Sequence, residues 1–149
     1  MMTINDPVFN EMTYDHGWEK KEWFRKNVAG DKIELRIHCQ AYSSSEKTQE
    51  ITEQQRLAYL KFKKDIADLG SCQIRLGAAI ERYAERNNIE LPLIAPNTLY
   101  ISRNGGYGLL CDCNWDKEHG CAVIFTNGDD GLYNNIPAGI YIGEQDELI

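Results

Sequence analysis

The amino-acid sequence predicts an α+β fold, in which one largely antiparallel sheet packs with one long helix. Three observations lead to this prediction: an alternation of apolar and polar residues near the N-terminus, a helical apolar period in the middle, and short strand-like segments near the C-terminus. Strands precede and follow the helical region, and this order favours α+β over a parallel α/β sheet. The 149 residues suit one domain, so we expect residues 1–149 to form a single domain.

The N-terminal region is predicted to form a three-stranded antiparallel meander. Apolar and polar residues alternate with a period of two over 32–42, which is typical of a half-buried strand. A turn at 29–31 precedes it, so residues 22–28 are its expected hairpin partner. The first strand is expected at 8–14 and closes with a turn at 15–17.

One long helix is predicted from Thr52 to about residue 87. Thr52 and Gln55 have the spacing of a capping box, in which each side chain binds the backbone amide of the other residue. The apolar stripe keeps its phase across Gly70, which favours one long helix, with a bend allowed there, over two crossing helices. The stripe consists of Tyr59, Phe62, Ile66, Leu69, Leu76, Ile80 and Tyr83.

The C-terminal region is predicted to add further antiparallel strands. Two prolines in the connector 91–96 exclude a central strand there. Turn-forming residues then separate several short apolar segments. The strands are expected at 98–102, 107–113, 121–126 and 138–142, with turns at 104–106 and 115–120 and a loop at 127–131.

Charge and composition restrict the class of partner and the cellular location. The net charge of −7 disfavours nucleic acid, because an acidic surface repels phosphate backbones, and it suits a basic protein partner. No apolar run approaches the ~20 residues of a membrane helix. The N-terminus lacks the basic start and apolar core of a secretory signal, so we expect a cytoplasmic protein without membrane contact. The oligomeric state stays open.

The densest group of reactive side chains lies in the segment 111–121, C-D-C-N-W-D-K-E-H-G-C. Cys111 and Cys113 share one face of a strand, and His119 and Cys121 repeat that spacing where the next strand begins. These four residues are candidate zinc ligands, because zinc prefers tetrahedral N and S donors. Structural zinc sites usually have C-x2-C knuckles, however, and strand cysteines often serve as small buried hydrophobes. We therefore expect no cofactor, with zinc as the alternative.

The same segment raises a second functional hypothesis, a small metal-dependent or thiol hydrolase. His119 can lower the pKa of a neighbouring thiol, and Asp116 or Glu118 can orient the imidazole. Residues this close in one turn rarely converge as nucleophile, base and acid. The favoured interpretation is structural: Asp116 binds the amides of the turn, and Gly120 adopts a positive φ. His38, which faces outward on its strand, is expected to be solvated.

Four blocks carry a resemblance to a known kind of family: Y-D-H-G-W at 14–18, I-T-E-Q-Q at 51–55 with Tyr59 and Phe62, C-N-W-D-K-E-H-G-C-A-V at 113–123, and I-G-E-Q-D at 142–146. Through them the whole chain resembles a family of uncharacterised bacterial domains of this size, and W-D-x-E-H-G is the most specific block. Such domains are similar to small immunity-type proteins of bacterial toxin systems, in which an acidic cytosolic protein binds and blocks a toxin. The resemblance implies no catalytic residue.

These observations together predict a non-enzymatic cytoplasmic binding protein. The resemblance suggests an immunity-type protein that blocks a partner toxin by steric occlusion. Aromatic and acidic loop residues are the candidates for contact, because aromatic side chains bury much area at little entropic cost. The candidate binding residues are Trp115, Asp116, Glu118, His119, Asp129 and Asp130.

Overall fold

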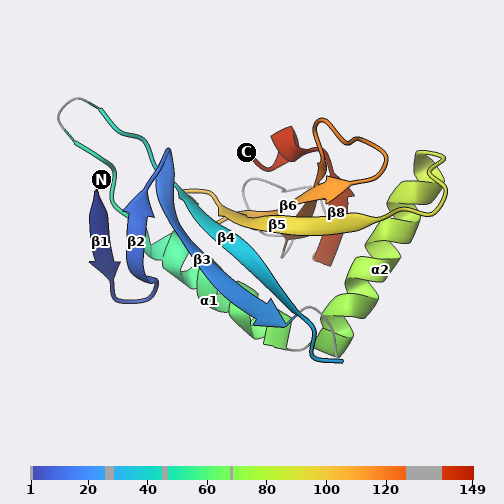
Figure 1. Ribbon diagram of the computed structural model, residues 1–149, viewed down its shortest axis with the longest axis horizontal. Coiled ribbons are helices and arrows are strands. Elements are labelled where there is room, and N and C mark those ends of the chain that lie inside the picture. Colours follow the sequence, from blue (N-terminus) through green and yellow to red (C-terminus); the bar gives the residue numbers. More distant parts are fainter. Residues whose placement is uncertain (1, 26–28, 45–46, 68, 127–138) are drawn as a thin grey trace.

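In the computed structural model, the described residues form an eight-stranded sheet with two α-helices packed on one of its faces (Figure 1). The structure describes residues 2–25, 29–44, 47–67, 69–126 and 139–149. Within these ranges, neither α-helix combines the length and apolarity needed to cross a bilayer. The elements are β1 (Thr3–Asp6), β2 (Asn10–Tyr14), β3 (Gly17–Arg25), β4 (Lys32–Gln40), α1 (Glu53–Ala67), α2 (Leu69–Arg86), β5 (Ile94–Ile101), β6 (Tyr107–Cys113), β7 (Cys121–Thr126), β8 (Gly139–Gly143) and the 3-10 helix η1 (Gln145–Glu147).

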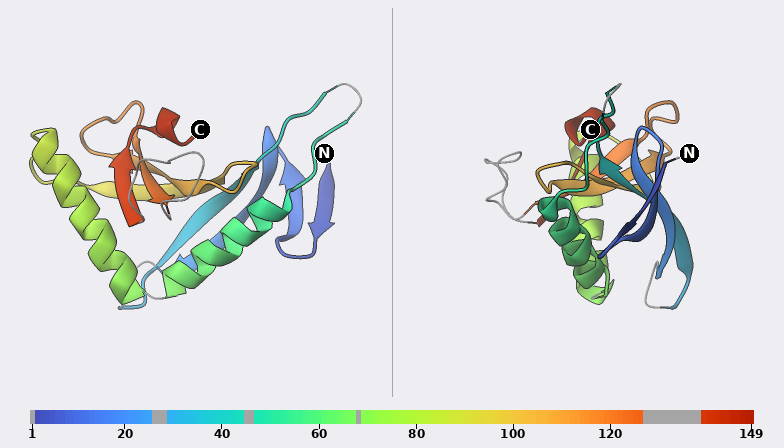
Figure 2. Two further views of the ribbon diagram at one scale, coloured as in Figure 1. Left: turned by 180° about the vertical axis from the view of Figure 1, so that it is seen from behind. Right: turned by 90° about the vertical axis from the view of Figure 1, so that its left-hand side faces the viewer.

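The predicted α+β class with one long helix is wrong. Most of the described elements are strands of one mixed sheet, and the helical region is divided into α1 and α2. The helices diverge from their shared end, so that α1 lies against β3 and α2 lies against β8 (Figures 1 and 2). Because a sheet of this width twists, one straight helix would leave half of its inner face uncovered. The fold is therefore mainly β, with two helices.

The strands follow one another across the sheet in sequence order, from β1 to β8. Neighbouring strands are antiparallel except β4 and β5, which run parallel and place Arg36 opposite Thr98. Parallel neighbours need a long crossover connection, and both helices lie in the connection between β4 and β5. The crossover thus joins the four N-terminal strands to the four C-terminal strands at the centre of the sheet.

Two local predictions are confirmed. The alternation at 32–42 corresponds to β4, in which Leu35, Ile37 and Cys39 are buried. The capping box is present at the start of α1: the Gln55 amide donates to Thr52 Oγ1 at 3.1 Å, and the Thr52 amide donates to Gln55 Oε1 at 3.0 Å. Both features depend on residues close in sequence, which is why the sequence pattern predicts them.

Strand β1 is an element that the sequence pattern does not reveal, because four residues are too few to show a period. Its end is held by Asp6, whose Oδ2 accepts hydrogen bonds from the amides of Val8 and Phe9 at 2.9 and 3.0 Å. The other oxygen of this buried carboxylate lies 2.7 Å from Nη2 of Arg56 on α1. The β1–β2 hairpin is therefore joined to the helix by an ion pair.

The two halves of the sheet are covered differently. The main core lies between the helices and the inner face, where the Phe62 ring packs edge-on against three rings, those of Phe24, Tyr107 and Phe125. On the outer face, buried Leu148 packs with Tyr100, Ala122 and Ile124 in a second, smaller core. The C-terminal strands are thus covered on both faces, whereas the outer faces of β3 and β4 carry exposed side chains.

Candidate functional site

The three thiols of the segment 111–121 lie together but are buried. Cys111 and Cys121 are directly opposite each other on β6 and β7, and Cys113 lies on the same inner face. A hydrogen bond with Cys111, together with burial, raises the pKa of Cys121, and burial raises the pKa of Cys113. Thiols that stay protonated are poor nucleophiles and poor metal ligands. These cysteines therefore act as small core residues.

His119 does not join the thiols. Its side chain is 73% exposed, and its Nδ1 lies 3.3 Å from Oδ1 of Asp116 within the same turn. Among the residues that the structure describes, no three His, Cys, Asp or Glu side chains are grouped to hold a metal ion. The four candidate zinc ligands are thus not brought together. The base of the hypothetical thiol hydrolase is likewise separated from its nucleophile.

The turn 115–120 has the structural role that its sequence predicts. Asp116 Oδ1 accepts a hydrogen bond from the His119 amide at 3.0 Å, and the Gly120 amide donates to the Asp116 carbonyl at 2.8 Å. Gly120 has φ of 67°, and a Cβ there would lie 2.2 Å from the Cys111 carbonyl oxygen. The Trp115 ring is half-buried and packs on Tyr83 of α2, with centroids 5.6 Å apart. The turn is therefore rigid.

Asn114 joins this turn to the connection between α2 and β5. Its Oδ1 accepts from the Leu93 amide at 2.9 Å, its Nδ2 donates to the Leu91 carbonyl at 3.0 Å, and its own amide donates to the Leu93 carbonyl at 3.2 Å. Leu91 has φ of 48°, a left-handed conformation that costs a non-glycine residue about 1–2 kcal/mol. The three hydrogen bonds hold the connection in this strained form.

The same connection exposes two leucines. Leu91 is 85% exposed and Leu93 is 69% exposed, beside a turn whose residues are themselves fixed by hydrogen bonds. We refer to Leu91, Leu93, Asn114 and residues 115–120 as the leucine tip. Exposed apolar side chains on a rigid, strained backbone are typical of contact surfaces and are not needed for the core.

The surroundings of the leucine tip are acidic. In the described segments 90–93 and 112–119, four carboxylates accompany a single lysine. The carboxylates belong to Glu90, Asp112, Asp116 and Glu118, and the lysine is Lys117. A partner with a basic rim and an apolar centre would complement this surface in charge and in polarity.

The candidate binding residues have different positions. Trp115, Asp116, Glu118 and His119 all belong to the leucine tip, and the Trp115 ring packs against α2. Asp129 and Asp130 lie outside the described residues. The sequence does not single out the two leucines. Their position on either side of Pro92 indicates an extended connector but does not indicate whether their side chains are exposed.

His38 is not solvated, although it faces outward. Its Nδ1 lies 2.5 Å from Oε2 of Glu19, and its ring stacks on Tyr100 with centroids 5.3 Å apart. Gly17 provides the space for the imidazole, because a Cβ there would lie 2.5 Å from His38 Nε2. The pair is fixed on the outer face of β3 and β4.

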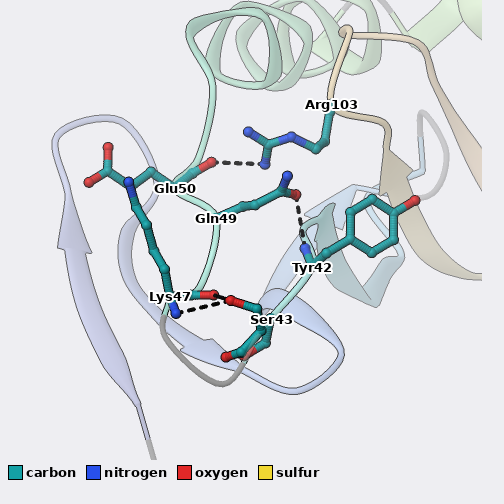
Figure 3. Close-up of a pocket in the computed structure, with 7 residues that line it drawn as sticks. Tyr42, Ser43, Lys47, Gln49, Glu50 and Arg103 are labelled. Atoms are coloured by element: carbon teal, nitrogen blue, oxygen red, sulfur yellow. Dashed lines mark hydrogen bonds between the residues drawn. The ribbon is translucent and has the colours of Figure 1, made fainter.

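A surface hollow of about 490 Å³ lies where residues 42–44 and 47–50 meet Arg103 of the β5–β6 turn (Figure 3). Figure 3 shows Gln49 between Tyr42 and Arg103. The Tyr42 amide donates to Gln49 Oε1 at 3.0 Å, and Arg103 Nη1 donates to the Glu50 carbonyl at 2.9 Å. The Arg103 carbonyl in turn accepts from Thr52 Oγ1 at 2.8 Å. These bonds connect Tyr42, Gln49 and Glu50 with the β5–β6 turn and the start of α1, which indicates a structural role.

The comparison with known families identifies part of the chain. Residues 84–148 match a domain of unknown function, DUF6985. This match covers less than half of the chain and agrees with the expectation of an uncharacterised domain family. No curated protein and no solved structure matches the chain. The DUF6985 segment contains the end of α2, strands β5 to β8 and the whole leucine tip.

Proposed function

We propose that this chain is a non-enzymatic binding protein and that the leucine tip contacts its protein partner. One observation carries the proposal: Asn114 makes three hydrogen bonds to the connection that exposes Leu91 and Leu93. A surface that is rigid before binding loses little conformational entropy when the partner docks. Two adjacent leucines can then bury apolar area without first ordering a loop.

The charge around the leucine tip supports a basic partner. Four acidic residues lie in the segments that carry the leucine tip, and the whole chain has a net charge of −7. Opposite charge accelerates association and excludes acidic competitors. An immunity-type protein that neutralises a basic toxin in the cytoplasm by covering its functional surface would have these properties. Steric occlusion requires no catalytic group on this chain.

The hydrolase hypothesis has less support. The nucleophile of such an enzyme must reach a substrate, but Cys111 and Cys121 are buried and their neighbour His119 faces solvent beside Asp116. Activating a thiol requires a base within hydrogen-bond reach and a lowered pKa, whereas the pKa of Cys121 is raised. We therefore retain binding as the function of this segment.

Replacing the two leucines tests the proposal. The tagged chain and its Leu91→Ser/Leu93→Ser variant are cross-linked to partners in the source organism, and the captured proteins are quantified by mass spectrometry. We expect the specific partner to bind the variant about tenfold more weakly or worse, because interface anchors contribute more than 1 kcal/mol each. Calorimetric titration of that partner then measures the dissociation constant.

Leu57→Ser/Leu60→Ser is the matched control, because these leucines are also exposed but lie on α1. This control is expected to bind as the unmodified chain does. Equal loss of binding in both double variants would indicate non-specific capture through apolar residues. Unchanged binding of the Leu91→Ser/Leu93→Ser variant would refute the leucine tip as the contact surface.

A further inference from the structure

Two positive side chains face each other on the outer face of the sheet, far in sequence from the leucine tip. Lys21 of β3 and Arg36 of β4 are directly opposite in the antiparallel register. Like charges in this position destabilise a sheet. Among the described residues, no carboxylate lies within ion-pair distance of Lys21, and the Arg36 Nε is 3.9 Å from Oε1 of Glu19. The repulsion is therefore largely uncompensated.

Glu19 is shared between His38 and Arg36, and its contact with His38 is the closer one. Its Oε2 lies 2.5 Å from His38 Nδ1, and the His38 ring is held by stacking on Tyr100. Gly17 leaves space for this imidazole, so the pair is part of the packed outer face. The Glu19 carboxylate is thus held next to His38, and its other oxygen lies 3.9 Å from the Arg36 Nε.

A hollow of about 200 Å³ lies beside the two cations and is lined by Lys21, Glu34, Arg36, Asn97 and Thr98. Arg36 is opposite Thr98 on β5, so three neighbouring strands contribute to its walls. The Thr98 hydroxyl donates to Asn97 Oδ1 at 2.8 Å, which orients the Asn97 amide group. An ammonium, a guanidinium, an amide and the Glu34 carboxylate thus line one small space, in which the cations outnumber the anion by two to one.

An exposed aromatic ring lies next to this hollow. Trp23 is two residues from Lys21 on the same strand, so both side chains project from the outer face. Its side chain is 63% exposed, although tryptophan is large and apolar. The register places Trp23 opposite Glu34, which lines the hollow. The ring therefore offers a flat surface beside a positively charged space.

We infer that this outer face binds a phosphate monoester carried on a flat aromatic body. A monoester has a charge of about −1.5 to −2 at neutral pH, and this charge matches Lys21 and Arg36 together better than a single carboxylate does. Arginine and lysine both bind phosphate oxygens, and the aromatic body would stack on Trp23. We refer to Lys21, Trp23, Arg36, Asn97 and Thr98 as the phosphate site. It shares no residue with the leucine tip, so this inference does not depend on the proposed function.

Titration of the full chain with phenyl phosphate tests the phosphate site. Quenching of indole fluorescence reports binding. Trp23→Phe identifies the part of the signal that comes from Trp23, because Trp18 is buried and Trp115 lies on the leucine tip. We expect saturable binding that is about tenfold tighter than that of inorganic phosphate, which cannot stack. Lys21→Gln and Arg36→Gln should each weaken binding about tenfold, because a hydrogen bond to a charged group contributes that factor or more. Lys47→Gln, which removes a surface lysine elsewhere, should bind normally.

A stability measurement keeps the variants interpretable. Removing one of two opposed like charges should raise the urea midpoint of Lys21→Gln while phosphate binding falls. A folded Lys21→Gln variant that binds phenyl phosphate as tightly as the unmodified chain overturns the inference. Benzoate or a single-stranded oligonucleotide binding as tightly as phenyl phosphate would also overturn it, since neither carries a monoester.

Two further ligands distinguish the possible sources of the phosphate. A phosphotyrosine peptide and a nucleoside monophosphate both present a phosphate monoester and an aromatic ring. Tighter binding of the peptide assigns a modified protein as the ligand, and tighter binding of the nucleotide assigns a small molecule. Failure of both to bind, in contrast to phenyl phosphate, would refute a biological role for the phosphate site.

Discussion

Asn114 and Gly120 illustrate how single residues shape the candidate contact surface. Asn114 provides the hydrogen bonds that hold the Leu91–Leu93 connection against the turn, and neither leucine contributes to them with its side chain. Gly120 allows the turn to pass close to the Cys111 carbonyl. The exposure of the leucines thus depends on the hydrogen bonds of Asn114 and on the positive φ and close backbone contact of Gly120.

Substituting glycines tests this conclusion at the residue scale. Gly120→Ala should lower the free energy of unfolding by about 2 kcal/mol or more, because it combines a positive φ with a steric overlap. Gly30→Ala is the matched control: its φ is 99°, but no atom lies within 4 Å of a Cβ there. Urea denaturation should show a loss of about 1 kcal/mol for this control. Equal losses for the two variants would contradict a steric role of Gly120.

At the scale of elements, the β1–β2 hairpin depends on its ion pair with α1. Burial by itself would raise the pKa of Asp6, but hydrogen bonds from Arg56 and from the amides of Phe9 and Val8 hold it below its ordinary value of 3.8. The ionised carboxylate is therefore favoured in the folded state, and the ion pair contributes stability above that value. The hairpin also contacts α1 through the Phe9 ring, which stacks on Tyr59 with centroids 4.4 Å apart.

Arg56→Ala should lower the free energy of unfolding by about 2–4 kcal/mol at neutral pH, because it leaves Asp6 buried without its partner. The unfolded chain takes up protons at Asp6 before the folded chain does. The stability contributed by the pair is thus lost progressively as pH falls below about 4 toward the lowered pKa of the folded chain, and the difference between variant and unmodified chain should shrink. Urea denaturation between about pH 7 and pH 3 measures this difference. A difference independent of pH would exclude the ion pair as its cause.

Arg75→Ala is the control for this experiment, because Arg75 is an exposed arginine on α2. Its substitution should change the free energy of unfolding by about 0.5 kcal/mol or less at either pH. A loss comparable to that of Arg56→Ala would indicate a general effect of removing positive charge from this acidic chain.

On the scale of the whole molecule, the sheet is divided into two halves with different outer faces. The C-terminal half is covered by η1 and Leu148, whereas the N-terminal half carries the phosphate site on its open face. The leucine tip lies in the DUF6985 segment, and Lys21 and Arg36 lie outside it. The two surfaces are therefore built from separate parts of the chain and can be tested independently.

Leu148→Ala should lower the free energy of unfolding by about 2 kcal/mol, because it removes the apolar cover of Tyr100, Ala122 and Ile124. Ile149→Ala is the matched control, since Ile149 is exposed and should contribute less than about 0.5 kcal/mol. Urea denaturation and hydrogen exchange of β7 amides measure the two effects. Equal stability of both variants would show that the outer core is dispensable.

Several features of this protein follow from its sequence alone. The alternation over 32–42, the capping box at Thr52 and the turn at 115–120 are all present in the structure. Each depends on residues a few positions apart, so the local backbone geometry determines the pattern. The sequence also marks the segment 111–121 as distinctive. Its density of reactive groups suggests chemistry, which the burial of its three thiols does not support.

Other features were decided only by tertiary structure. The divergence of α1 from α2, the parallel pairing of β4 with β5, the opposition of Lys21 to Arg36 and the exposure of Leu91 and Leu93 all depend on contacts between distant segments. The helical period in the sequence indicates which face of a helix is apolar. It does not indicate that the helix axis changes direction between α1 and α2. Whether a loop leucine is buried or exposed likewise depends on which strand lies beside it, and pairing over long distances sets that neighbour.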